Sequence, residues 1–457
     1  MLELLRHPRA DAAVSLVLAL TIFSFAAASS SVLTHGRTSE ARWAMLGVLA
    51  AVAVLVAAAR PRRPLVVPAP ALLAGVFVVL AAASTLWSVD PRLTVKKTAA
   101  NALLVGTAFL LAYACEGRRE RVERVLHGVL GGAVLVAVAG LVVLSVDRTD
   151  AAPGKVDQFL SRFQGFGERP TTDAMLYALA LPVAALVVVR ARSVRGRALG
   201  IAAFALVDTL LIFSGSRGPQ IGGIAGTVVL GLVLSRRGLL VLAAAVAATT
   251  VLAVVVVLAQ TQGRPPAPQP GSTASAPATA SRPAASSPGE LAQELGHGSN
   301  TDQRTIFGSS GRLGAWSFAI RQGNERPGLG FGFGTEERVF ENHTYGYEGN
   351  QVSSSWIGLY LQLGLVGVLL LLAIWGSLAA TLLGLVRRGR DPVALAAAGV
   401  VVAALPLTFV ESWIYAVGNV ATVPFWISAL LLGAFVRERA TERVAVVSDA
   451  KREPLVV

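Results

Sequence analysis

The chain has little charge and almost no cysteine. Of its 457 residues, 54% are apolar and 15% are charged, and the mean hydropathy is +0.62. A water-soluble protein of this length needs more polar surface, so the composition excludes a soluble globular protein and indicates an integral membrane protein. The one cysteine, Cys115, lies in an apolar run. A single cysteine excludes an intramolecular disulfide and a cysteine-rich metal site.

The net charge of +13 would suit a polyanionic partner such as a nucleic acid. The arginines, however, gather in short loops between apolar runs, where membrane topology explains them without any such partner. We therefore expect no nucleic acid partner.

Twelve apolar runs are long enough to cross about 30 Å of hydrocarbon as helices. They lie near 12–33, 43–59, 66–87, 98–115, 125–146, 172–191, 198–214, 219–234, 238–259, 357–386, 393–410 and 416–436. The first run is followed by further spans and shows no convincing small-residue cleavage site, so we interpret it as a signal anchor.

The short loops between these runs differ in charge according to their parity. One set holds sixteen arginines in 30 residues, and the other holds ten lysines or arginines in 53. The positive-inside rule then places both termini in the cytoplasm and the second set of loops outside. The sequence predicts an all-α, multi-pass protein of the cytoplasmic membrane, with nine spans in 1–259, three in 357–436 and a cytoplasmic tail at 437–457.

The long connection 260–356 is predicted to lie outside, between the ninth and tenth spans. Its part 264–289 holds seven prolines among alanines and serines, a composition that precludes a packed core and predicts disorder. The part 300–356 carries aromatic residues, paired charges and patterned glycines, and is predicted to be ordered.

The run GRLGAWSFAIR (311–321) in this connection has its apolar residues at roughly helical spacing. The pattern predicts a helix that lies on the membrane surface. The apolar residues are Leu313, Trp316, Phe318 and Ile320.

The stretch FSGSRGPQIGG (213–223) places an arginine between two apolar runs, on the predicted outer side. Ser216 can act as an N-cap, and Gly218 and Pro219 then open the eighth span, with proline at its favoured first helical position. The free N–H groups of a helix N-terminus favour an anion, and Arg217 adds a fixed charge. The alternative is that Arg217 reaches the outer lipid headgroups. The glycines beyond it predict close approach of another helix or of a ligand.

Other polar residues join this candidate site. Arg162 and Arg312 lie in segments predicted to face the same side, and several arginines on one face suggest a diphosphate ligand. The alternative for each is a solvated loop charge. Asp208 lies inside the seventh span, where a carboxylate is functional by default. It can equally hydrogen-bond to a neighbouring helix.

Several motifs, in this order, resemble those of the O-antigen ligase and O-antigen polymerase superfamily of polytopic glycosyltransferases. They are STLWSVDPRLTVKKT (84–98), RFQGFGERPTTDAMLYALAL (162–181), FSGSRGPQIGG (213–223), GRLGAW…PGLGFGFG (311–334) and WIGLYLQLGLVGVLL (356–370). Their order, spacing and common predicted side make the resemblance fairly specific.

The resemblance implies a GT-C-like fold and a glycosyltransferase that needs no metal or cofactor. Its donor would be a glycan on undecaprenyl diphosphate, its acceptor a hydroxyl of a glycan or glycolipid, and its setting the outer face of the bilayer. Arg217 and Arg312 would stabilise the leaving diphosphate, with Arg162 nearby and Ser216 and Gly218 in the same binding stretch. Nothing in the sequence indicates the oligomeric state.

The catalytic base is where the chain departs from the family pattern. The family shows His-Asn eleven residues before the first glycine of its Gly-Leu-x-Gly run, and counting back from Gly364 reaches Ser353 and Ser354. His343, ten residues earlier, is the candidate base, and the alternative is that it is a surface histidine. The reserve acid–base residues are Glu348, Glu341, Glu411 and Asp208.

Three other functions remain open. A polymerase of the same superfamily would use the same donor with another acceptor. A glycolipid transporter or flippase would suit twelve spans, although no internal repeat is visible. A non-catalytic glycolipid-binding assembly protein would explain the missing His-Asn.

Overall fold

The computed structural model describes residues 8–28, 39–59, 67–146, 162–165, 170–231, 237–247, 249, 251, 312–340, 351–388, 391–433 and 435. Every regular element in these ranges is helical. Several predictions lie outside the described residues: the disordered insert 264–289, the tail 437–457, and the candidate site residues His343, Glu341 and Glu348.

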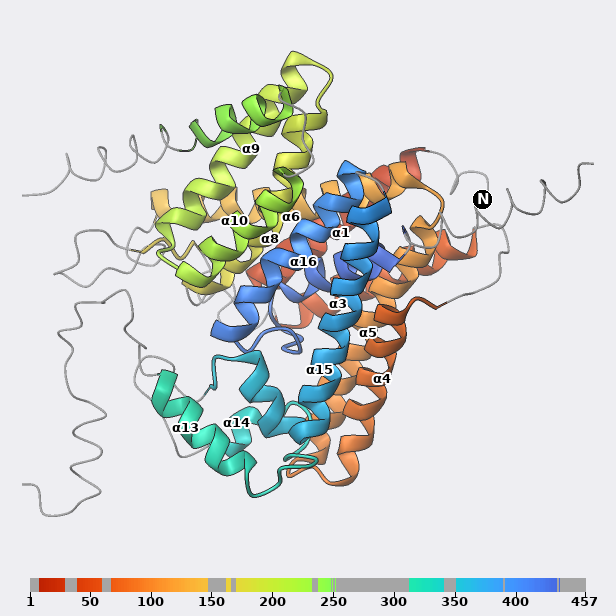
Figure 1. Ribbon diagram of the computed structural model, residues 1–457, viewed down its shortest axis with the longest axis vertical. Coiled ribbons are helices and arrows are strands. Elements are labelled where there is room, and N and C mark those ends of the chain that lie inside the picture. Colours follow the sequence, from red (N-terminus) through yellow and green to blue (C-terminus); the bar gives the residue numbers. More distant parts are fainter. Residues whose placement is uncertain are drawn as a thin grey trace, which may run out of the picture.

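The described ranges contain thirteen numbered helical elements, and Figure 1 labels the α-helices among them. The thirteen elements are α1 (Pro8–Ala27), α3 (Ser39–Ala58), α4 (Ala69–Ala83), η2 (Ser84–Leu86), α5 (Pro91–Cys115), α6 (Arg119–Val146), α8 (Pro170–Arg190), α9 (Val194–Phe213), α10 (Arg217–Gly231), α13 (Arg312–Gly323), α14 (Glu336–Val339), α15 (Ser355–Arg388) and α16 (Pro392–Val410). Two shorter apolar helices, Arg237–Ala247 and Thr422–Gly433, complete the described part.

The multi-pass membrane class predicted from composition is confirmed. Within the described residues, nine helices are long and apolar enough to cross a membrane. Each of the twelve predicted runs overlaps a described helix, but three of those helices are shorter than a full span. The total of twelve crossings therefore stays a prediction.

Helix α10 packs between α8 and α16 through glycines. A Cβ placed on Gly226 would lie 2.8 Å from Pro182 Cγ of α8 and would overlap the Gly399 carbonyl oxygen of α16. A Cβ on Gly222 would overlap the carbonyl oxygen of Ala403. Because lipid tails are as apolar as leucine, close backbone packing of this kind is what holds helices together in a membrane.

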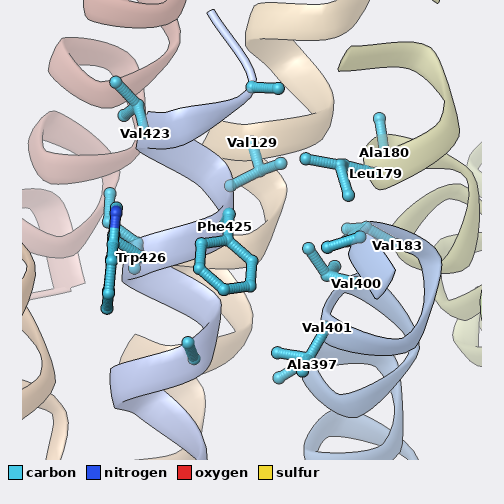
Figure 2. Close-up of a cluster of buried hydrophobic side chains, with 14 of the residues drawn as sticks. Val129, Leu179, Ala180, Val183, Ala397, Val400, Val401, Val423, Phe425 and Trp426 are labelled. Atoms are coloured by element: carbon cyan, nitrogen blue, oxygen red, sulfur yellow. The ribbon is translucent and has the colours of Figure 1, made fainter. Parts of the chain in front are cut away.

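Apolar side chains from segments far apart in the sequence fill the centre of the bundle. Figure 2 shows Val129 of α6, Leu179 of α8, Val400 of α16 and Phe425 of Thr422–Gly433 in one buried cluster. The Phe425 ring packs edge-on against Trp426, with their centroids 5.2 Å apart. The described helices around this cluster therefore share one core.

Helix α15 is interrupted, although the sequence predicts one span over 357–386. Gly364 has φ 63° and ψ −158°, so the segments 355–363 and 365–388 are separate helices. The loop that precedes α14 docks at this break, where the carbonyls of Leu361 and Gln362 accept hydrogen bonds from Phe331 N (3.0 Å) and Gly332 N (2.8 Å). Gly364 is required because a Cβ there would overlap the Gly328 carbonyl.

The predicted helix over 311–321 exists as α13, and its place on the membrane surface stays a prediction. Its buried residues include Ala315, Phe318 and Ala319, whereas Leu313 and Ile320 are 61% and 42% exposed. Phe318 packs edge-on against Phe340, with centroids 4.8 Å apart. In Figure 1, α13 and α14 lie together at one end of the molecule, beside the first half of α15.

Candidate anion-binding site

Arg162 fastens the turn that precedes α10. Its Nε donates to the Ser214 carbonyl oxygen (2.6 Å), and its Nη2 donates to Ser216 Oγ (2.8 Å). Between these two residues Gly215 adopts φ +61°, a conformation that glycine takes without strain. Arg162 therefore holds the backbone from which Arg217 projects.

Arg217 is the first residue of α10 and is exposed. The helix begins two residues earlier than predicted, so Pro219 is its third residue and the prediction that proline opens the helix is wrong. Proline is tolerated there because the first N–H groups of a helix have no intrahelical acceptor. Arg217 thus adds its charge to the positive end of the helix dipole.

The third arginine, Arg312, is connected to the start of α10 through the end of α16. A Cβ on Gly218 would lie 2.5 Å from Val410 Cγ2, so the start of α10 touches the end of α16. Glu411 follows Val410 and pairs with Arg312, with 3.7 Å between Oε1 and Nη2. The Arg312 and Glu411 side chains keep 26% and 16% of their surface exposed.

These contacts connect five predicted site residues, which we call the arginine cluster: Arg162, Ser216, Arg217, Arg312 and Glu411. Its members come from the segment before α8, the start of α10, the start of α13 and the end of α16. Arginine forks and helix N–H groups suit phosphate oxygens, so the arrangement can hold an anion that carries two or more charges.

Sequence reasoning missed Glu336, a carboxylate at the start of α14 that is 8% exposed. Its Oε1 accepts from Val352 N (2.6 Å) and lies 3.3 Å from Ser412 Oγ, and its Oε2 accepts from Gln362 Nε2 (3.2 Å) and Tyr415 OH (3.3 Å). Burial raises the pKa of Glu336, against the opposing effect of these four donors. The partners lie 16 to 79 residues away, so no local pattern reveals them.

The serines found where the family shows His-Asn lie between Glu336 and the arginine cluster. Ser354 N donates to Ser412 Oγ (3.1 Å), and Ser355 Oγ donates to the Glu411 carbonyl oxygen (2.7 Å). Ser353 is buried and has φ +52°, the one positive φ of a non-glycine residue in the described ranges. Serine hydroxyls are poor general bases without a basic partner, so these residues do not replace histidine.

The remaining predicted residues lie elsewhere or outside the described part. Asp208 of α9 lies within reach of Thr249, and its assignment as a reserve acid–base residue stays a prediction. His343, Glu341 and Glu348 are not among the described residues. In the described part of the chain, no three His, Cys, Asp or Glu side chains are grouped so as to hold a metal.

Together the fold and the cluster define a class: a multi-pass helical membrane protein with a cationic site built from the ends of its helices. Comparison with known proteins finds a family model that matches part of the chain. Residues 201–372 match the model described as O-antigen ligase, and this match supports the superfamily that the motifs indicated. The matched range includes Arg217, Arg312 and Glu336, and excludes Arg162 and Glu411.

No curated protein matches the chain. A chain from the solved structure titled "Structural coordination of polymerization and crosslinking by a peptidoglycan synthase complex" is similar to this one, with 18% identity and a TM-score of 0.33. The similarity covers 78% of this chain and 96% of that chain. At this TM-score it carries no weight for the site.

Proposed function

We propose that the protein is a membrane glycosyltransferase that moves a glycan from a polyprenyl diphosphate carrier to an acceptor hydroxyl in cell-surface polysaccharide assembly. The arginine cluster is the observation that carries this proposal. The O-antigen ligase domain supports it, because members of that superfamily act on lipid-linked glycans.

In the proposed reaction the acceptor oxygen attacks the anomeric carbon of the donor sugar, and the bond from that carbon to the diphosphate oxygen breaks. Negative charge then grows on the leaving diphosphate, where Arg217 and Arg312 stabilise it. Ser216 and Gly218 shape the adjoining backbone, and Arg162 holds that backbone in place. The acceptor proton passes to a base, for which we retain His343.

We further propose the topology that the loop charges predict: twelve crossings of the cytoplasmic membrane, both termini in the cytoplasm and the arginine cluster outside. The chain would meet its donor within the outer leaflet, where the diphosphate of a polyprenyl lipid lies at headgroup depth. Labelling of single cysteines placed at Arg217 and at Arg119 with an impermeant thiol reagent, in a Cys115→Ala background, tests the orientation. Labelling at 119 alone in intact cells would contradict it.

The direct test uses purified protein in nanodiscs, with an undecaprenyl-diphosphate-linked oligosaccharide and a glycan acceptor. The protein should release undecaprenyl diphosphate, and Arg217→Ala should slow that release about 100-fold or more, as loss of a transition-state charge partner does. Arg321→Ala, which removes an exposed arginine from α13, is the matched control and should leave the rate unchanged.

The same assay separates the alternatives. A transferred glycan that itself serves as acceptor for further donor units identifies a polymerase, and one on another glycolipid identifies a ligase. Wild-type protein that binds donor without releasing diphosphate would be a binding protein, and movement of the intact glycolipid across liposomes would identify a flippase. Either of the last two results overturns the proposed function.

A further inference from the structure

We propose that Glu336 is a positioning residue that keeps Arg312 in place in the arginine cluster by joining the start of α15 to the segment after α16. The inference rests on the proposed function only in assigning the cluster to a diphosphate ligand. It concerns a residue that lies outside the cluster itself.

Hydrogen bonds and an ion pair fix the chain segment that carries Glu336. The segment that leads into α14 is bound to the α4–α5 corner, because Phe333 N donates to Ser84 Oγ (3.0 Å) and Thr94 Oγ1 donates to the Phe333 carbonyl (2.9 Å). After Glu336 in the chain, Arg338 of α14 pairs with Asp90, with 3.0 Å between Arg338 Nε and Asp90 Oδ2. The carboxylate therefore projects from a segment anchored on both sides.

From that anchored position the carboxylate fixes two chain segments. Oε1 accepts from Val352 N and lies beside Ser412 Oγ, and Ser412 also bonds to Ser354. The bonds to Val352 and Ser354 flank Ser353, whose left-handed backbone costs energy and persists only where its surroundings enforce it. Glu336 thus enforces the turn that begins α15.

The turn in turn sets the position of Glu411. Ser355 Oγ donates to the Glu411 carbonyl and accepts from Trp413 N (3.2 Å), so the segment 411–413 follows the start of α15. Glu411 then orients the Arg312 guanidinium at 3.7 Å. A chain of contacts therefore leads from Glu336 through Ser355 and Glu411 to Arg312.

The Glu336 carboxylate and its hydrogen-bond partners are closely packed. Gly358 of α15 faces them, and a Cβ at that position would overlap Tyr415 OH and lie 3.0 Å from Glu336 Oε2. The side-chain amide of Gln362 has a fixed orientation, because its Oε1 accepts from Gly334 N (2.7 Å) while its Nε2 donates to Glu336. A flipped amide would lose both hydrogen bonds. An amide at position 336 would therefore place two N–H groups against each other.

The test measures the affinity of the full-length protein in nanodiscs for undecaprenyl diphosphate. Glu336→Gln should weaken binding about tenfold, within the usual coupling range of one hydrogen-bonded network. Gln362→Glu added to Glu336→Gln restores the donor–acceptor pair and should recover most of the affinity. Glu337→Gln removes an exposed carboxylate from the same helix and should change nothing.

A double-mutant cycle shows whether Glu336 acts through Arg312. In an Arg312→Ala background Glu336→Gln should have almost no further effect. A full additional loss in that background, or wild-type affinity in Glu336→Gln, would overturn the inference. If Glu336→Gln does not fold, Ser412→Ala replaces it in the same cycle. Protein that binds the lipid with this coupling but never transfers glycan would refute the proposed function and leave the inference intact.

Discussion

Two acidic side chains are buried in the described part of the molecule, and their surroundings differ completely. Glu336 is 8% exposed and has four hydrogen-bond donors around its two oxygens. Asp173, in the first turn of α8, is 1% exposed, and neither of its oxygens has a partner among the described residues. One turn further along α8, the hydroxyl of Tyr177 is also buried, with no hydrogen-bond partner in the part of the chain that the structure describes.

The two carboxylates differ in what they contribute to the structure. Around Glu336, a loop and three helix ends are joined through polar atoms, so the carboxylate is part of the structure. Asp173 lies against Gly165, where a Cβ would come within 3.0 Å of its Oδ2, and its carboxylate joins no other described segment through a hydrogen bond. A buried polar group without a partner costs free energy, whereas one with donors stabilises the chain segments that supply them.

The largest effect is expected from Glu336→Leu. The substitution leaves four donors buried without an acceptor, and should lower the free energy of unfolding by roughly 4 kcal/mol. Chemical unfolding of the protein in detergent micelles measures this loss. Glu337→Leu, on the exposed side of the same helix, is the control, and an equal loss in both variants would remove the distinction drawn between the two carboxylates.

A smaller loss is expected from Gly226→Ala, in the glycine-packed region. Its Cβ would meet Pro182 Cγ at 2.8 Å and the backbone of α16 still closer. Overpacking of this kind costs about 1–3 kcal/mol. Gly231→Ala on the same helix meets nothing within 4 Å, and is expected to keep or slightly raise stability because alanine favours a helix.

These expectations also show what a sequence can and cannot supply. The membrane class and the positions of the helices follow from apolar runs, and the arginines of the cluster follow from their common predicted side. The hydrogen-bond network of Glu336 does not follow from the sequence, because it depends on contacts among positions 336, 352, 362, 412 and 415. The break in α15 at Gly364 depends equally on a loop more than 30 residues earlier in the sequence. Local pattern carries no information about either.

A third and smaller effect is a pH dependence. Burial raises the pKa of Glu336 above its ordinary value of 4.5, so the folded protein binds this proton more tightly than the unfolded chain does. The contribution of Glu336 to stability is then greatest below about pH 4.5 and is lost as the pH rises through the folded-state pKa. Unfolding measured from pH 4 to pH 8 should show this decline in the wild type, and a flatter profile in Glu336→Gln. Parallel profiles would contradict the assignment.

The smallest effect is expected at Asp173. Asp173→Asn keeps the shape of the side chain and removes an unpartnered carboxylate, so the free energy of unfolding should change by less than about 1 kcal/mol or rise. The same unfolding assay tests it. A loss as large as that of Glu336→Leu would mean that Asp173 has a partner in the folded protein, and the contrast between the two carboxylates would fail.

The interruption of α15 has a consequence for how the protein meets its bilayer. The segment 365–388 is long enough, at about 1.5 Å per residue, to cross the hydrocarbon alone. Membrane helices accommodate thickness by tilting, and a helix without a break would carry that tilt directly to its end at Ser355. At Gly364 the helix is broken, and the 326–334 loop is hydrogen-bonded to residues on both sides of the break, which fixes the angle between the two segments. The direction of the short segment that begins at Ser355 is therefore set by this loop and not by one continuous helix through the bilayer.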